Sequence, residues 1–161
     1  MHTLKYSQKL PLSLAESWNF FSSPANLKII TPEHLRFEIT SAHESRTMYP
    51  GQIIAYTVRP VANIPLEWVT EITHVKEPIY FIDEQRVGPY KFWHHEHRFH
   101  PIPNGVELVD VIHYNMPYGV FGKLLHFLKV KRDLEAIFAY RHTKLEELFG
   151  IYTHRDSKIG F

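Results

Sequence analysis

The sequence predicts an α+β domain in which an antiparallel sheet of about seven strands curves around one long C-terminal helix. Short runs of alternating apolar and polar residues fill most of the chain up to residue 117. Turn-forming residues separate these runs at short intervals, so neighbouring strands are expected to pair antiparallel. After residue 119 the apolar residues recur at helical spacing instead. This terminal helix is the only element large enough to cover the apolar face of the sheet.

The N-terminal elements are expected to be a strand and two short helices. Residues 2–10 alternate between apolar and polar side chains, which is typical of a strand with one exposed face. Ser13 and Glu16 have the spacing of a capping box at the start of the first helix. Pro24 is well placed as the first residue of the second helix, and Pro32 ends it.

Six further strands are expected in the middle of the chain. Pro, Gly and Asn residues mark the turns between them. The expected strands are residues 35–42, 51–59, 66–75, 79–85, 91–102 and 106–115. We expect the last two to form a hairpin, because the Asn104-Gly105 pair between them favours a two-residue turn.

The C-terminal helix is predicted from its apolar spacing. The apolar positions are Phe127, Val130, Leu134, Ile137, Phe138, Leu145 and Leu148. They continue through about seven turns of 3.6 residues each. Gly150 is the residue type that commonly follows the end of a helix. We therefore expect one domain over residues 1–150 and a C-terminal tail over residues 151–161.

Composition excludes several classes of function. The 161 residues are 44% hydrophobic, which is enough for one sizeable core and argues against disorder. The formal net charge of +1 gives no overall reason to expect nucleic acid as a partner. The absence of cysteine excludes disulfides, thiolate catalysis and thiolate zinc sites. No apolar run approaches membrane-spanning length, so we expect no integral membrane segment and a soluble cytoplasmic protein.

The most informative segment is the predicted strand over residues 91–102. Its side chains alternate between two faces, and one face carries Trp93, His95, His97 and Phe99. The other face carries Phe92, His94, Glu96 and Arg98. Two imidazoles between two aromatic residues indicate a wall that is apolar enough to be buried and polar enough to bind a ligand group.

The hairpin is expected to bring further polar residues to this face. With a turn at residues 104–105, His95 faces Tyr114, and Asp110 lies diagonal to His97 on the same face. A three-residue turn reverses the parity and moves Asp110 to the opposite face.

The preceding strand and the C-terminal helix add two charged residues. Pairing of strand 79–85 places Asp83 near Trp93. Arg141 falls on the apolar stripe of the helix, so it needs an acceptor, which Asp83, Asp110 or an anionic ligand group can supply. The candidate ligand-binding residues are therefore Asp83, Gln85, Trp93, His95, His97, Asp110, Tyr114 and Arg141.

Several motifs, together with the order of elements, carry a resemblance to a known superfamily. They are Phe81-Ile82-Asp83-Glu84-Gln85, Gly88-Pro89-Tyr90, Trp93 with His95, His97 and Phe99, Asp110-Val111 with Tyr114, Pro117 with Gly119, and Ile137-Phe138 with Tyr140-Arg141. Over roughly residues 2–150 the chain resembles the START-like (SRPBCC) superfamily. The likeness is nearest to small bacterial polyketide cyclase/dehydrase-type ligand-binding proteins, including some once labelled cell-division inhibitors. It implies a helix-grip fold, but the superfamily includes lipid carriers, hormone receptors and aromatase/cyclases, so fold alone does not assign function.

Three functions fit these observations. The first is binding of a hydrophobic small molecule (a lipid, polyketide or aromatic metabolite) in a cavity between the sheet and the C-terminal helix. The alternative is a cyclase- or lyase-type enzyme in which His95 or His97 acts with Asp110 as a general acid–base pair. The third is an interaction protein that binds a partner through an exposed apolar surface.

The histidines and aspartates have two interpretations, a metal site and a hydrogen-bonded core network. His95 and His97 with Asp83 or Asp110 have the donor types that zinc or iron uses. The sequence leaves the third metal ligand uncertain, so the same residues fit better a hydrogen-bonded core network in which Asp orients His. No nucleophile motif, phosphate-binding loop or cofactor fingerprint is present in the sequence. We therefore expect no metal and no cofactor.

Overall fold

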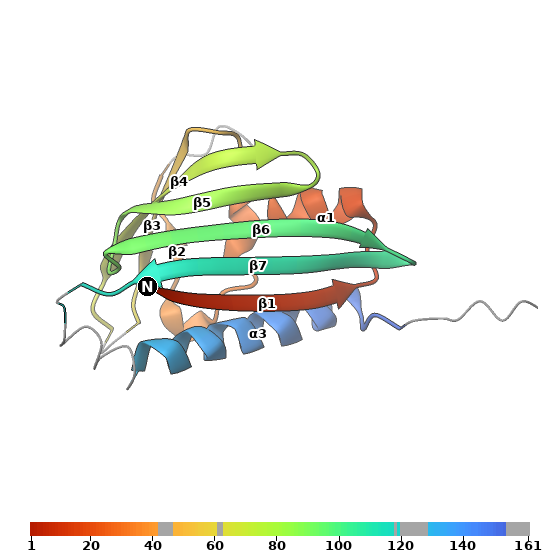
Figure 1. The fold of residues 1–161 in the computed structure, drawn as a ribbon. Helices are drawn as coiled ribbons and strands as arrows, with labels where there is room; N and C mark the ends of the chain where they lie inside the picture. The colour runs from red at the N-terminus through yellow and green to blue at the C-terminus, as the bar shows by residue number, and fades with distance from the viewer. Residues whose placement is uncertain (42–46, 61–62, 118, 120–128, 154–161) are drawn as a thin grey trace, which may run out of the picture.

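A computed structural model describes residues 1–41, 47–60, 63–117, 119 and 129–153, and it confirms the predicted α+β fold class (Figure 1). The elements in chain order are β1 (His2–Leu10), α1 (Leu14–Phe21), the 3₁₀ helices η1 (Pro24–Lys28) and η2 (Glu33–Leu35), β2 (Glu38–Ile39), β3 (Gln52–Val58), β4 (Leu66–Lys76), β5 (Tyr80–Val87), β6 (Phe92–Ile102), β7 (Gly105–Asn115) and α3 (Lys131–Phe149). Among the described residues, no helix is long and apolar enough to cross a membrane.

The strands form one seven-stranded sheet in the order β1-β7-β6-β5-β4-β3-β2, and every neighbouring pair is antiparallel. The sheet curves, with α1 behind β6 and α3 running alongside β1 (Figure 1). Helix α3 contacts β1, and α1 contacts β6 and β7. The sheet and α3 therefore enclose a common interior, as the apolar periodicities predicted.

The first helix begins where the capping box was predicted. The Glu16 backbone N–H donates to the Ser13 hydroxyl at 3.2 Å, and the Ser13 backbone N–H donates to the Glu16 carboxylate at 2.9 Å. These two bonds satisfy N–H groups that a helix start otherwise leaves without partners. The second short helix begins at Pro24 as expected, but it is a 3₁₀ helix.

The predicted strand over residues 35–42 is wrong. Leu35 ends η2 instead, and β2 is only the two residues Glu38–Ile39. The Arg36 N–H donates to the Glu33 carbonyl at 2.9 Å, and Arg36 has a left-handed φ of 46°. Because a strand requires extended backbone, this residue prevents β pairing before residue 38.

The C-terminal helix is shorter in the described residues than predicted. Helix α3 has 19 residues, or about five turns, and Phe127 lies outside the described residues. Leu134, Phe138 and Leu145 are buried on one face, but Leu148 is 43% exposed and Phe149 packs on the core instead. Gly150 follows the helix with a positive φ of 90°, as its position in the sequence predicted.

The hairpin between β6 and β7 turns one residue earlier than predicted. Ile102 pairs with Gly105, so the turn is Pro103-Asn104, and Asn104 takes the positive φ of 58°. A proline followed by a residue with positive φ is typical of a type II turn. Gly105 is instead the first strand residue, where a Cβ would lie 2.4 Å from the Leu10 carbonyl oxygen.

The interior contains two aromatic clusters. In the first, the ring of Trp18 meets Phe81 and Phe99 edge-on. The second joins the sheet to α3 and consists of Trp93, Ile112, Tyr114, Leu134 and Phe138. The polar residues described next lie between the two clusters.

Candidate functional site

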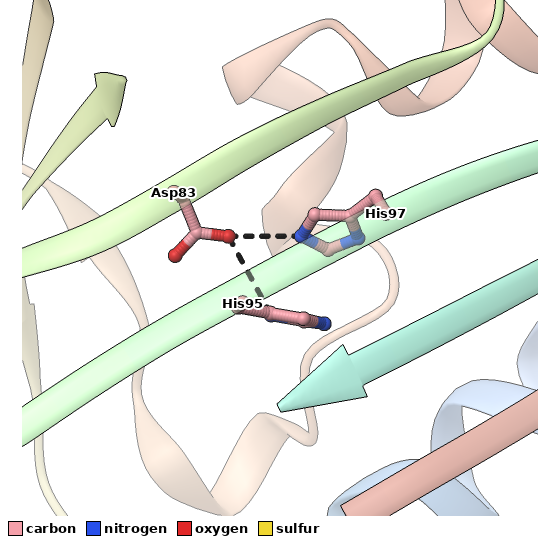
Figure 2. A group of neighbouring side chains, drawn as sticks. All are labelled: Asp83, His95 and His97. Atoms are coloured by element: carbon pink, nitrogen blue, oxygen red, sulfur yellow. Dashed lines mark hydrogen bonds and ion pairs between the residues drawn. The ribbon is translucent and has the colours of Figure 1, made fainter. Parts of the chain in front are cut away.

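Four polar side chains from three adjacent strands meet on the inner face of the sheet. Asp83 on β5 pairs directly with His95 on β6, and His97 pairs directly with Asp110 on β7. Side chains two residues apart on β6 share a face, so the two imidazoles stand side by side with one carboxylate on each flank. Figure 2 shows Asp83, His95 and His97 pointing toward one another.

The predicted pairings were wrong by two residues in both ladders. Asp83 was expected near Trp93, and His95 opposite Tyr114, whereas Asp83 pairs with His95 and Trp93 pairs with Tyr114. The earlier turn at Pro103-Asn104 explains the β6–β7 difference. Because an offset of two residues preserves the alternation of faces, the predicted set still shares one side of the sheet.

Each carboxylate contacts both imidazoles. Asp83 Oδ2 lies 2.9 Å from His97 Nε2 and 3.5 Å from His95 Nδ1. Asp110 Oδ1 lies 2.7 Å from His97 Nδ1 and 3.1 Å from His95 Nε2. The centroids of the two rings are 3.7 Å apart. All four side chains are 15% exposed or less, so the group is largely shielded from water.

Arg141 brings a positive charge from α3 to the same place. Its Nη1 lies 3.5 Å from Asp110 Oδ2, and its guanidinium carbon lies 5.4 Å from the ring centroid of Phe21 and 5.7 Å from that of Phe138. Arg141 follows Phe138 by three residues, so it falls on the buried face of α3, as predicted. We call Asp83, His95, His97, Asp110 and Arg141 the polar cluster.

The surroundings shift the pKa values of the two carboxyl groups downward. Burial opposes ionisation of Asp110, but the Arg141 charge and hydrogen bonds from both histidines outweigh it and hold the pKa of Asp110 well below its usual range. Burial also opposes ionisation of Asp83, and the hydrogen bond from His97 with the charges of both imidazoles lowers its pKa overall. Both aspartates are therefore ionised at neutral pH.

The two histidines shift in opposite directions. Burial, followed by the neighbouring charge of His97, lowers the pKa of His95. Burial also disfavours charge on His97, but hydrogen bonds to Asp110 and Asp83 raise its pKa overall. His97 faces a carboxylate oxygen from each nitrogen, an arrangement that satisfies a doubly protonated ring.

Three predicted site residues lie outside the polar cluster. Gln85 donates to the Tyr90 carbonyl at 2.7 Å and accepts from the Tyr90 N–H at 3.2 Å, so it secures the β5–β6 connection. Trp93 and Tyr114 are buried in the second aromatic cluster, and Trp93 lies edge-on to His95 with ring centroids 6.1 Å apart.

A pocket of about 220 Å³ opens between β1, β7 and α3. Its lining includes Asp110 and Arg141 of the polar cluster, together with Tyr6 and Gln8 of β1. Sequence reasoning missed these β1 residues. Their alternation placed them on the apolar face of the strand, but nothing local showed that β1 pairs with β7. His95 and His97 are not among the lining residues, and the acid–base alternative stays a prediction.

No protein-family model matches the chain, and no curated protein matches its sequence. Solved structures do match its fold. Protein CV1439 from Chromobacterium violaceum is 10% identical with a TM-score of 0.71, and the match covers 93% of this chain and 98% of that one. Ginseng major latex-like protein 151 from Panax ginseng is 12% identical with a TM-score of 0.66, covering 92% and 97%. Protein Ms6760 from Mycobacterium smegmatis is 15% identical with a TM-score of 0.64, covering 91% and 92%. At these identities the likeness is one of fold, and it confirms the predicted helix-grip fold.

Proposed function

We propose that this helix-grip protein binds a small hydrophobic molecule with an anionic end in the pocket between β1, β7 and α3. A lipid, a polyketide and an aromatic metabolite all include molecules of this kind. The observation that carries the proposal is the guanidinium of Arg141, which lines an otherwise partly apolar pocket while it is largely buried.

Within the part of the chain that the structure describes, Arg141 has hydrogen-bonding capacity that its neighbours do not use. A guanidinium carries several N–H donors in a planar fork and has no acceptor. Within the described residues, Asp110 is the one carboxylate within 4.0 Å of Arg141, and its 3.5 Å separation is long for a hydrogen bond. An anionic group in the pocket can accept two parallel bonds from such a fork. The ligand end that suits this site is therefore a carboxylate or a similar planar anion.

The apolar part of the lining suits an apolar body, whereas Ser7, Gln8, Glu135 and His142 make the remaining lining polar. Tyr6 and Phe138 stack at a centroid separation of 4.0 Å, and Leu108 and Leu145 add aliphatic surface. The volume of about 220 Å³ is below the roughly 300–1,000 Å³ of sites for drug-sized ligands. The pocket therefore suits a short molecule or the anionic end of a longer one.

Calorimetric titration with octanoate and 1-octanol tests the proposal, because the two probes share an alkyl chain and differ at the polar end. We expect octanoate to bind at least about tenfold more tightly, a difference of about 1.4 kcal/mol. Arg141→Gln removes the discrimination, since a neutral amide cannot form the charge-assisted pair. Arg98→Gln is the matched control, because Arg98 pairs with Glu96 on the outer face of β6.

Native mass spectrometry of protein purified from its own host provides a second test. A retained acidic small molecule, released on denaturation and lost in the Arg141→Gln variant, supports the proposal. Equal affinity of the wild type for the acid and the alcohol, or no binding of either, contradicts it.

A further inference from the structure

We propose that Asp83, His95 and His97 form a binding site for one divalent transition-metal ion of the zinc and iron class. This inference goes beyond the proposed function and does not rest on it, because the metal ligands lie beside the pocket and not in its lining. It also reverses the expectation of no metal, which was drawn from the sequence alone.

The donor atoms of the three residues converge. One carboxylate oxygen and one nitrogen of each ring all lie within 4.8 Å of one another. Asp83 Oδ2 is 2.9 Å from His97 Nε2 and 3.5 Å from His95 Nδ1 (Figure 2). Two ligands bound at about 2.1 Å, at angles between octahedral and tetrahedral, stand about 3.0–3.4 Å apart. The separations from Asp83 Oδ2 are therefore close to those of ligands that share an ion.

The opposite nitrogens of both rings provide a second, independent observation. His97 Nδ1 and His95 Nε2 both lie within hydrogen-bond distance of Asp110 Oδ1, at 2.7 and 3.1 Å. A histidine that binds a metal commonly donates its other N–H to a carboxylate, which fixes the tautomer and the ring orientation. When both rings are neutral, Asp110 thus directs a lone pair of each imidazole toward Asp83, and a bound metal ion takes the place of the proton that His97 otherwise shares with Asp83. Arg141 pairs with the other oxygen of Asp110.

The charge of the polar cluster is consistent with a cation at this point. Asp83 and Asp110 carry two negative charges against the one positive charge of Arg141, so neutral imidazoles leave a net charge of −1 in a shielded location. Two histidines and one carboxylate are a donor set that zinc and iron accept and that leaves coordination positions open. The Asp83 side chain, at 15%, is the most exposed of the polar cluster.

Titration of the metal-stripped full-length protein with Co²⁺ or Zn²⁺ alone tests the site. We expect one equivalent of Co²⁺ to produce visible d–d absorption. In ¹⁵N-labelled wild-type protein, Zn²⁺ should shift the imidazole nitrogen signals of His95 and His97 and leave that of His94 in place. His94 is the internal control, because it lies on the outer face of β6 and pairs with Glu84 at 2.8 Å.

Variants localise the site further. Asp83→Asn and His97→Gln should each weaken Co²⁺ binding at least about 100-fold, and Asp110→Asn about 10–100-fold, because Asp110 only orients the ligands. Glu84→Gln, on the same strand and the outer face, should leave the affinity unchanged. Absence of saturable binding by the wild type overturns the proposal, and so does Zn²⁺ binding that shifts neither His95 nor His97. The wild-type measurements decide the question even where a variant fails to fold.

Discussion

Asp110→Asn removes the one charge that both histidines and Arg141 share, without changing the shape of the side chain. In the wild type Asp110 accepts from His97 at 2.7 Å and from His95 at 3.1 Å, and it pairs with Arg141 at 3.5 Å. The asparagine leaves the buried guanidinium and imidazolium without this counter-ion. Removal of one partner from a buried ion pair costs about 3–5 kcal/mol.

The expected cost can be measured by urea unfolding of metal-stripped protein at pH 7. In thermal unfolding of the same proteins, a loss of 3–5 kcal/mol in a domain of this length lowers Tm by about 6–20 °C. The matched control is Glu107→Gln on the same strand, since Glu107 faces the other side and accepts from Ser7 at 2.6 Å. We expect the control to change stability by less than about 1 kcal/mol.

The pH dependence of the same comparison has a defined sign. The pKa of Asp110 in the folded protein lies well below its usual value of 3.8, so its ionised form is stabilised by folding. This contribution is fully present above the unfolded pKa and is lost as pH falls through the folded pKa. The difference between wild type and Asp110→Asn should therefore shrink under strongly acid conditions. A variant within about 1 kcal/mol of wild type at pH 7, or a difference independent of pH, refutes the reasoning.

Three further predictions concern other parts of the molecule. Gly105→Ala should destabilise the protein by about 1–3 kcal/mol in urea unfolding, because the added Cβ meets the Leu10 carbonyl oxygen at 2.4 Å. An unchanged free energy of unfolding means that β1 and β7 can separate freely there. Ser13→Ala should cost about 1 kcal/mol through loss of the capping box, and an unchanged midpoint rules out that role. Hydrogen bonds to Asp110 and Asp83 raise the pKa of His97, so its contribution to stability is fully present below about pH 6.5 and is lost as pH rises through the folded pKa. NMR titration of the His97 ring in metal-stripped protein should show this raised pKa, and a midpoint at or below that of a free histidine contradicts it.

Local patterns in the sequence predicted most of the fold. The alternation in residues 2–10, the capping box at Ser13 and the helical spacing before Gly150 each depend on neighbours a few residues away. The same reasoning placed His95 and His97 on one inward face of β6, because alternation along a strand follows from backbone geometry alone.

Tertiary structure decided how these elements meet. The sequence could not show whether residues 103–104 or 104–105 form the turn, and this difference decides which residues pair between β6 and β7. It also could not show that β1 pairs with β7, where Leu4 lies opposite Ile112, and so it missed the pocket that β1 lines. Such contacts join residues far apart in the chain, and they are selected by the packing of the whole sheet against α3. The convergence of Asp83, Asp110 and Arg141 on the two histidines is a product of that packing, since no local pattern specifies which distant strand supplies a partner.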